Sequence, residues 1–439
     1  MTSRAEITEI QVYARVEEVD VEGRRVLLDC TTASSPTLRR LINESHQQLR
    51  NRWRRSFRLT EDPAAPSMDL LTEVPTAIVT ARVDNLMRWQ ELMAEATWLQ
   101  LPLPTNALNT EEPVTVGADD FEVVSPREAK KLSAILDMVN WPRVTAPRLR
   151  GVLDSIPTVE GVIVHDVGQG SANALFDSSG KAVVYFDVGR GGKGTSAPVN
   201  LDLCDCSTPL VLLSHWDRDH WAAAKDGKQG LLKSCWVVPS QKIAGTHAKF
   251  AALILQQGGS IFVVKRSSKP GKDLPYGQRI YLKYGKGADR NNSGLTLTLT
   301  CAISCPSHTM FFPGDARYDM CEEPPHKVAL LVASHHGADP GGTSNLPRPA
   351  SGRRSRLVYS FGPKNGYKHP FKKALTAHGS QGWNHTGWNH SKWNLSPQTG
   401  NVRATYTDSD ANRQSILFSS GNCSPAAHFR AVHGETLLS

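Results

Sequence analysis

The residues best suited to chemistry lie in the run Ser214-His215-Trp216-Asp217-Arg218-Asp219-His220. The run follows the apolar stretch 210–213 directly and precedes 221–225, which we predict to be helical. Imidazole and carboxylate groups are ligands for Zn²⁺, and a carboxylate-rich set also suits Mn²⁺. A turn between strand and helix can direct these side chains towards one point, so the run predicts a metal centre. Its candidate ligands are His215, Asp217, Asp219 and His220.

Three further segments place Asp or His directly after apolar, strand-like residues. The first is His165-Asp166-Val167-Gly168-Gln169-Gly170-Ser171, and the second is Tyr185-Phe186-Asp187-Val188-Gly189. The third is Phe311-Phe312-Pro313-Gly314-Asp315-Ala316, followed by Leu331-Val332-Ala333-Ser334-His335-His336-Gly337. An Asp after a strand is ordinary turn chemistry when it occurs once. The recurrence of this pattern favours a shared site over a chance cluster of salt-bridged surface residues.

Short apolar runs recur through the C-terminal two-thirds and end in polar clusters. Such runs are typical of a buried sheet whose C-terminal edge carries the chemistry. The runs are 161–167, 182–187, 209–213, 261–264, 295–303, 310–312, 328–333 and 357–361.

The first 150 residues carry no comparable signature. Alternating patterns predict strands over 7–16 and 19–28, and helical spacing predicts helices over 36–58, 84–100 and 126–140. We expect an accessory α-rich or α+β domain over 1–150, a proline-containing linker over 142–157, and a catalytic domain over 158–425. The arginine-rich stripe of 36–58 could touch phosphates, although a solvated face or a partner-protein surface is the commoner explanation.

Charge is unevenly distributed along the 439 residues. Residues 1–150 hold 19 Lys and Arg against 22 Asp and Glu, a net charge of −3, so the total of +8 leaves +11 for the remainder. A basic surface concentrates anionic partners such as nucleic acid, although an arginine-rich composition alone would give the same total. No apolar run approaches the roughly 20 residues of a membrane span, and the start lacks a secretory pattern. We therefore expect no membrane association and a cytoplasmic location.

A tryptophan repeat of five-residue period occupies 383–395, with Trp383, Trp388 and Trp393 each followed by Asn. This period matches neither a helix nor a strand face. The repeat could form a base-stacking platform or an inserted loop.

The order of these motifs resembles the metallo-β-lactamase superfamily, and more narrowly the hydrolase domain of ComEC-type competence proteins. The matching stretches are Asp-Val-Gly-Gln-Gly, Asp-x-Gly, Ser-His-x-Asp-x-Asp-His, Pro-Gly-Asp, His-His-Gly and Asn-x-Tyr-x-His-Pro, the last at 365–370. The resemblance covers about residues 160–420 and none of 1–150.

This resemblance implies an αββα sandwich with two divalent ions, Zn²⁺ or Mn²⁺, at one edge of the sheets. His215 and Asp217 would hold one ion, Asp219 and His220 the other, Asp315 would bridge both, and one of His335 and His336 would complete the set. Further implied roles are orientation of the ligands by Asp166 and Asp187, and substrate contact by Asn365, Tyr367 and His369.

Two positions depart from the superfamily pattern. Asp217 stands where the pattern has a second histidine, and the isolated middle histidine has no clear counterpart; only His247 and His308 are available. We predict His247 to lie on a helix surface. The first ion would have a more oxygen-rich set of ligands, and could be Mn²⁺, weakly bound, or absent.

These features predict a metal-dependent hydrolase, most directly a phosphodiesterase or nuclease that uses a metal-activated hydroxide. Asp219 or Asp217 would accept the proton and His369 would stabilise developing charge. The alternatives are a small-molecule metallohydrolase acting on a phosphoester, lactone, lactam or thioester, and a non-catalytic protein with a decayed metal site. The first 150 residues could recruit a partner protein.

Overall fold

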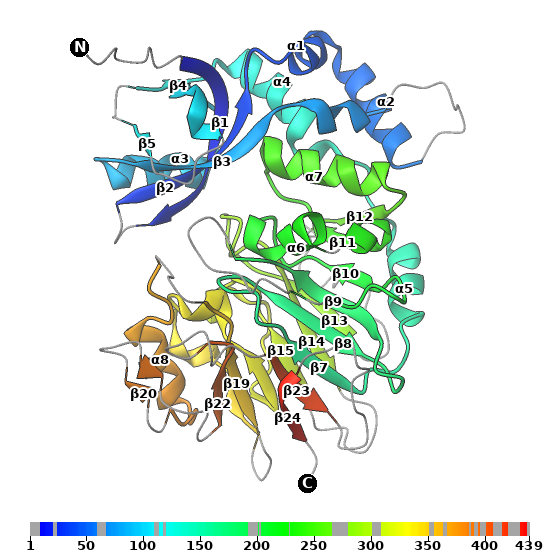
Figure 1. The fold of residues 1–439 in the computed structure, drawn as a ribbon, viewed down its shortest axis with the longest axis vertical. Coiled ribbons are helices and arrows are strands. Elements are labelled where there is room, and N and C mark those ends of the chain that lie inside the picture. Colours follow the sequence, from blue (N-terminus) through cyan, green and yellow to red (C-terminus); the bar gives the residue numbers. More distant parts are fainter. Residues whose placement is uncertain are drawn as a thin grey trace, which may run out of the picture. The chain divides into compact units, whose positions relative to one another are not determined.

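The structure is a computed structural model of the chain. It describes residues 9–20, 24–58, 67–108, 114–116, 120–191, 201, 203–227, 229–265, 280–300, 309–350, 355–362, 367–385, 388–389, 394–395, 401–406, 415–419 and 431–436. The chain forms two compact units: Met1–Pro142 with Gln241–Gly258, and Arg143–Ser240 with Gly259–Ser439. The described residues form a mixed α/β protein with eight α-helices and several sheets (Figure 1).

The first unit is built on one six-stranded sheet in the order β5-β3-β2-β1-β4-β6. One face is apolar and packs against α3, whose Trp89 and Leu92 join a core with Val12, Ala14 and Leu28. The opposite face is buried but polar, with Arg15, Glu17, Asp29 and Thr31 among its side chains. The strands are β1 (Glu9–Asp20), β2 (Arg25–Thr32), β3 (Thr76–Arg82), β4 (Leu99–Pro104), β5 (Val114–Thr115) and β6 (Glu122–Val123).

The helices of this unit are α1 (Pro36–Asn43), α2 (His46–Ser56), α3 (Leu86–Glu95), α4 (Pro126–Leu136) and α7 (Gly245–Gln256). The prediction of a single helix over 36–58 is wrong, because the chain forms two helices that are separated at Ser45. Its side chain accepts from the Gln48 N–H and the Gln48 side chain accepts from the Ser45 N–H, a capping box that begins a new helix. Likewise, α3 begins after Asn85, and β4 occupies the end of the helix expected over 84–100.

The segment Gln241–Gly258 belongs to the first unit, although the sequence analysis placed it inside the catalytic domain. The chain passes through this segment between the neighbouring parallel strands β11 (Cys235–Pro239) and β12 (Ser260–Val264). Gly245 starts α7 in close contact with β2, because a Cβ there would lie 1.8 Å from Thr31 Oγ1. The connection from β11 to β12 is therefore built into the first unit.

The second unit contains an eight-stranded sheet, β12-β11-β10-β9-β8-β7-β23-β24, and a six-stranded sheet, β13-β14-β15-β17-β19-β22. Side chains from both sheets form one core, including Phe186 of β9 and Phe312 of β15, whose ring centroids are 5.8 Å apart. The two sheets therefore pack face to face. Their strands are β7 (Gly161–Val164), β8 (Ala172–Phe176), β9 (Ala182–Val188), β10 (Leu210–Leu212), β13 (Ile280–Tyr284), β14 (Leu295–Thr300), β15 (Thr309–Phe312), β17 (Leu330–Val332), β19 (Arg356–Tyr359), β22 (Val402–Ala404), β23 (Ser415–Ser419) and β24 (Ala431–Thr436). Two small ribbons complete the unit: β16 (Lys327–Val328) with β18 (Arg348–Pro349), and β20 (Trp388–Asn389) with β21 (Asn394–Leu395).

The expected apolar runs all contain strands, but the expected linker is wrong. Residues Ala146–Asp154 form α5, and Leu149 and Leu153 enter the core between the sheets. Pro147 fits the first turn of a helix, where its missing N–H costs nothing, so the prolines mark a helix start rather than a linker. The other helices are α6 (Ala222–Asp226), as expected, and α8 (Lys372–Ser380), which lines the outer face of the six-stranded sheet. None of the described helices combines the length and apolar character needed to cross a membrane.

Candidate metal centre

The polar side chains of the second unit meet because neighbouring strands end at a common edge. Asp187 lies at the end of β9, and His215 follows its parallel neighbour β10. Asp315 follows β15, and His336 follows the parallel β17 of the other sheet. Parallel strands end at the same edge, so residues distant in sequence are brought within ligand distance.

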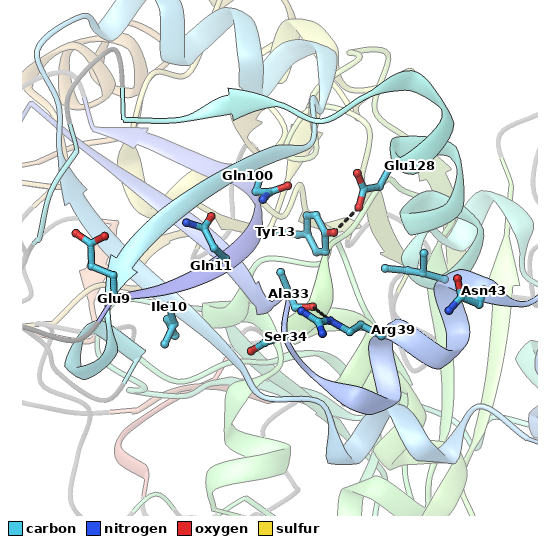
Figure 2. A pocket seen from close by; sticks show the side chains of 11 residues that line it. Glu9, Ile10, Gln11, Tyr13, Ala33, Ser34, Arg39, Asn43, Gln100 and Glu128 are labelled. Atoms are coloured by element: carbon cyan, nitrogen blue, oxygen red, sulfur yellow. Dashed lines mark hydrogen bonds between the residues drawn. The ribbon is translucent and has the colours of Figure 1, made fainter.

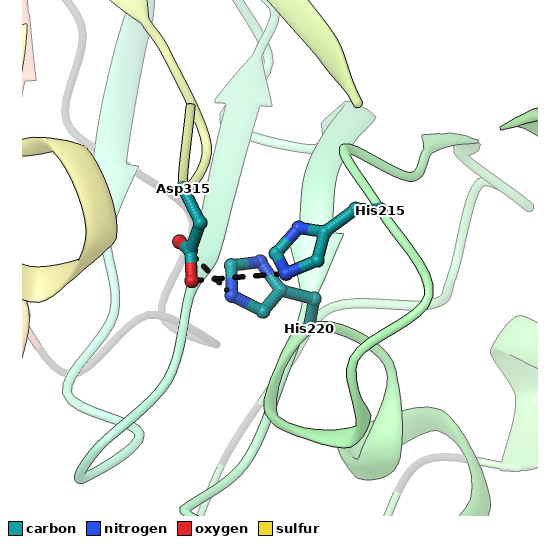
Figure 3. Close-up of side chains that lie close together, drawn as sticks. All are labelled: His215, His220 and Asp315. Atoms are coloured by element: carbon teal, nitrogen blue, oxygen red, sulfur yellow. Dashed lines mark ion pairs between the residues drawn. The ribbon is translucent and has the colours of Figure 1, made fainter. Parts of the chain in front are cut away.

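His215, His220 and Asp315 form the first group that could hold a metal ion (Figure 3). The Nε2 atoms of His215 and His220 lie 3.7 and 3.2 Å from Asp315 carboxylate oxygens. Ligands about 2.0–2.1 Å from a tetrahedral ion are about 3.3 Å apart, so these spacings suit one ion. His220 also joins the second group, Asp219, His220 and His336, in which His336 Nε2 lies 3.3 Å from Asp219 Oδ2.

The ring orientations leave metal-binding atoms facing the site. His220 Nδ1 donates to Asp187 Oδ2 at 2.8 Å, while His215 Nδ1 lies 3.0 Å from Ser214 Oγ, which donates to the same carboxylate oxygen. A histidine ligand with its other ring nitrogen fixed in this way offers its Nε2 lone pair to a metal. Within the described part of the chain, the Nε2 atoms of His215, His220 and His336 are buried without a hydrogen-bond partner. These orphaned atoms fit a divalent cation.

Asp187 supports the ligand loop from behind. Its carboxylate accepts from the Ser214 N–H at 2.7 Å as well as from Ser214 Oγ and His220. The backbone at Asp187 is left-handed, with φ of 64°. A non-glycine residue in this region is strained, and the three hydrogen bonds to its side chain hold it there.

The His335–His336 turn is also left-handed, with φ of 45° and 55° at the two residues. Ser334 anchors it: its hydroxyl donates to Ala316 O at 2.7 Å, and its N–H donates to Tyr318 Oη at 3.2 Å. Consecutive left-handed residues cost about 1–2 kcal/mol each, so packing must impose this turn. The conformation directs His336 inward, at 3% exposure of its side chain, whereas His335 keeps 25%.

A buried hydrogen-bond network lies behind this turn. His378 of α8 contacts Tyr318 Oη through Nε2 at 2.9 Å and Tyr359 Oη through Nδ1 at 2.7 Å. Burial, together with a smaller effect of the neighbouring His385, lowers the pKa of His378 to about 3, so the ring is neutral at physiological pH. Sequence analysis missed this network because its members are separated by tens of residues and form no motif.

The carboxylates of the centre favour the binding of a cation there. Burial raises the pKa of Asp315, but the imidazoles of His220 and its neighbours outweigh burial and hold that pKa well below its ordinary value. Conversely, burial lowers the pKa of His220, but Asp315, Asp187 and Asp219 outweigh burial and raise it well above the usual range. The carboxylates around His220 thus attract either a proton or a metal ion.

Asp217 has a different environment from the other predicted ligands. Its Oδ1 pairs with Arg290 Nε at 2.6 Å, while Oδ2 lies 3.3 Å from His215 Nε2. Asp217 belongs to neither group of three candidate ligands. Sequence analysis missed Arg290, which lies between β13 and β14 in no motif.

His369 lies beside the two groups and contacts Gln169. Its Nδ1 is 3.0 Å from Gln169 Nε2, and its ring centroid is 5.4 Å from that of His335. Burial lowers the pKa of His369 well below the usual range, helped by His335 and His336. Tyr367 stacks on His369 at 5.8 Å, and the predicted Asn365 lies outside the described residues.

Three further predictions concern residues near these motifs. Asp166 Oδ1 accepts from the Gly168 N–H at 3.1 Å, which shapes the turn leading to Gln169. Trp383 is 1% exposed and donates to Pro347 O, so it is a core residue and cannot serve as a stacking surface; the side chains of Trp388 and Trp393 lie outside the described set. His247 is fully buried in the first unit, so the expectation of a helix-surface residue is wrong; His308 is not described.

A cavity of about 500 Å³ lies in the first unit (Figure 2). Tyr13 and Glu128 both line it, and the Tyr13 hydroxyl donates a hydrogen bond to the Glu128 carboxylate. Arg39 donates to Ala33 O at 3.3 Å. Burial raises the pKa of Tyr13 to about 12, and Glu128 adds to this effect. The described residues that line the cavity include no His or Cys. This cavity is therefore not a candidate metal centre, although it is large.

Comparison with known proteins adds no family assignment. No protein-family model matches the chain, and a search of curated proteins found no match.

Proposed function

We propose that the second unit is a metal-dependent hydrolase of the metallo-β-lactamase type that cleaves a phosphodiester, with nucleic acid as the substrate class. One observation carries the proposal: the two groups of candidate ligands share His220 at the common edge of two sheets. The proposed αββα sandwich is supported by the core shared between the two sheets and by α8 on the outer face of one of them.

Of two divalent ions, one would be held by His215 and Asp315 and the other by Asp219 and His336. His220, whose Nδ1 donates to Asp187, has only its Nε2 left and would bind one of the two. When bound, such ions lower the pKa of a water ligand towards about 7 and neutralise charge on a phosphoryl group. The residues around them have separable roles. Asp187 fixes the ring of His220, and the strained turn at His335 and His336 positions the last ligand.

Proton handling falls to two residues. Asp219 keeps 22% of its side chain exposed and contacts His336, and its carboxylate oxygen that does not bind the ion would accept the proton. His369 is neutral because of its lowered pKa. With the Gln169 amide donating to Nδ1, the proton of His369 resides on Nε2, which can donate a hydrogen bond to a substrate oxygen.

The phosphodiester is favoured by charge. The net charge of +11 beyond residue 150 attracts polyanions, and Arg290 lies at the site through its pair with Asp217. A guanidinium suits the oxygens of a phosphate group. A neutral lactone or lactam would gain nothing from this charge.

The test is cleavage of labelled single- and double-stranded DNA and RNA by the purified chain with Mn²⁺ or Zn²⁺. We expect cleavage that EDTA abolishes and that added metal restores. The matched control is the His215→Asn, Asp315→Asn double variant, which removes ligands from the first group. Failure of the wild type to cleave any of these substrates would overturn the proposal.

A further inference from the structure

A second cluster of carboxylates and imidazole lies in the first unit and includes His247, which the sequence predicted to lie on a helix surface. Glu17 of β1, Asp29 of β2 and His247 of α7 place one ligand atom each within 4.8 Å of one another. Their side chains are 3%, 1% and 0% exposed. The cluster is therefore closed to solvent.

The spacing of the three ligand atoms suits one metal ion. His247 Nε2 lies 3.1 Å from Glu17 Oε1 and 3.6 Å from Asp29 Oδ2. These values bracket the edge of about 3.3 Å expected between ligands of a tetrahedral ion. Two carboxylates converge on the same imidazole nitrogen, as they would around a shared cation.

The charge of the cluster gives an independent reason to expect a metal ion there. Two ionised carboxylates with one protonated imidazole would leave a net negative charge in a closed site, whereas a divalent cation with a neutral imidazole gives none. The guanidinium of the nearby Arg15 pairs with Asp137 at 2.8 Å. A buried charge without compensation is costly.

We propose that Glu17, Asp29 and His247 form a closed site for one divalent cation, Zn²⁺ or Mn²⁺, which fastens α7 to the sheet of the first unit. A site whose ligands are all sealed from solvent cannot admit a substrate, so the ion would be structural rather than catalytic. The ion would join β1, β2 and a segment more than 200 residues away in the chain. Asp29 also accepts from the Thr246 N–H at 2.9 Å, so the same carboxylate caps the start of α7.

The test counts ions in the full chain after dialysis against Zn²⁺ or Mn²⁺ and removal of free metal. The starting protein is the His220→Asn, Asp315→Asn, His336→Asn variant, in which both ligand groups of the proposed catalytic centre are disabled. We expect it to retain one ion per chain and to lose that ion when His247→Asn is added. Asp137→Asn is the matched control, since Asp137 is equally buried and accepts from Ile243 N in the same segment; it should keep the ion.

Anomalous diffraction from the starting variant locates the ion even if His247→Asn does not fold. A peak bonded to His247 Nε2 supports the proposal. A chain without metal, or a peak confined to the second unit, overturns it, and leaves a proton shared by Glu17, Asp29 and His247 in place of the ion. A different result would contradict the proposed catalytic centre: the wild type would then bind no more metal than the starting variant.

Discussion

The two clusters of histidine and carboxylate use the same ligand types in opposite settings. In the second unit, the ligands follow strand ends at a sheet edge, and Asp219 and His335 keep 22% and 25% of their side chains exposed. In the first unit, Glu17 and Asp29 project from within a sheet face and His247 covers them, all at 3% exposure or less. A sheet edge leaves room for substrate, and a covered sheet face does not. The cluster in the first unit is therefore suited to holding the fold together, and the cluster in the second unit is suited to chemistry.

The largest expected effect is on the cleavage rate, which the cluster in the second unit should control, whereas the cluster in the first unit should control stability. Asp315→Asn should lower phosphodiester cleavage by about 10³-fold or more, because it removes a carboxylate from the first ligand group and unbalances the charge around His220. Glu17→Gln should mainly lower the midpoint of thermal unfolding. Rate assays and thermal melts on both variants measure this difference. A cleavage rate of Asp315→Asn at a tenth of the wild-type rate or above would contradict the proposed role of Asp315.

The next effect concerns substrate rather than metal. His369→Asn should lower kcat by about 10²-fold, because a hydrogen bond to the reacting group is lost. The metal content should stay at the wild-type value, since His369 belongs to neither ligand group. Lys372→Ala, an exposed change on α8, is the control. A loss of metal in His369→Asn would show that His369 holds the centre together instead.

A smaller effect is expected from the residue behind the ligands. Asp187→Asn should weaken metal binding by about 10–100-fold, because it disturbs the hydrogen bonds that orient His220 and Ser214. Competition with a chromophoric chelator measures the affinity. Excess metal should restore most of the cleavage rate, and the ion in the first unit should be unaffected. Equal affinity in variant and wild type would remove Asp187 from this role.

The smallest effect is a change in pH dependence. The pKa of His378 is about 3 in the folded chain, below the value of about 6.5 for a free histidine. A depressed pKa contributes stability that is present above about pH 6.5 and is lost as the pH falls towards 3. One such group gives a slope of at most about 1.4 kcal/mol per pH unit in the free energy of unfolding. His378→Gln should therefore flatten the slope of denaturant-melt stability between pH 6.5 and 4; an unchanged slope contradicts this assignment.

Local patterns in the sequence predicted those parts of the protein that local chemistry governs. The apolar runs of the C-terminal part are strands because continuous β-branched and aromatic stretches are stable only inside a sheet. Asp187, His215 and Asp315 follow those strands closely, so their approach to one edge was predictable. Arg290 and His378 were not, since each reaches the site through a long-range contact and belongs to no motif.

Local patterns failed where a cap or a long-range contact decides the outcome. Ser45 divides one apolar periodicity into two helices, and the prolines near residue 147 begin α5 instead of a linker. His247 shows the same limit. Its local sequence predicts only a helix, whereas its burial against Glu17 and Asp29 depends on where the tertiary structure packs that helix.

The sequence by itself determined the strands, the polar residues at their ends and the residue types of the candidate metal centre, because each depends on neighbours within a few residues. Only the tertiary structure decided which histidines lie in one group that could hold an ion, which unit contains Gln241–Gly258 and which polar groups are sealed from water. Those outcomes depend on contacts between segments far apart in the chain, and no local pattern records them.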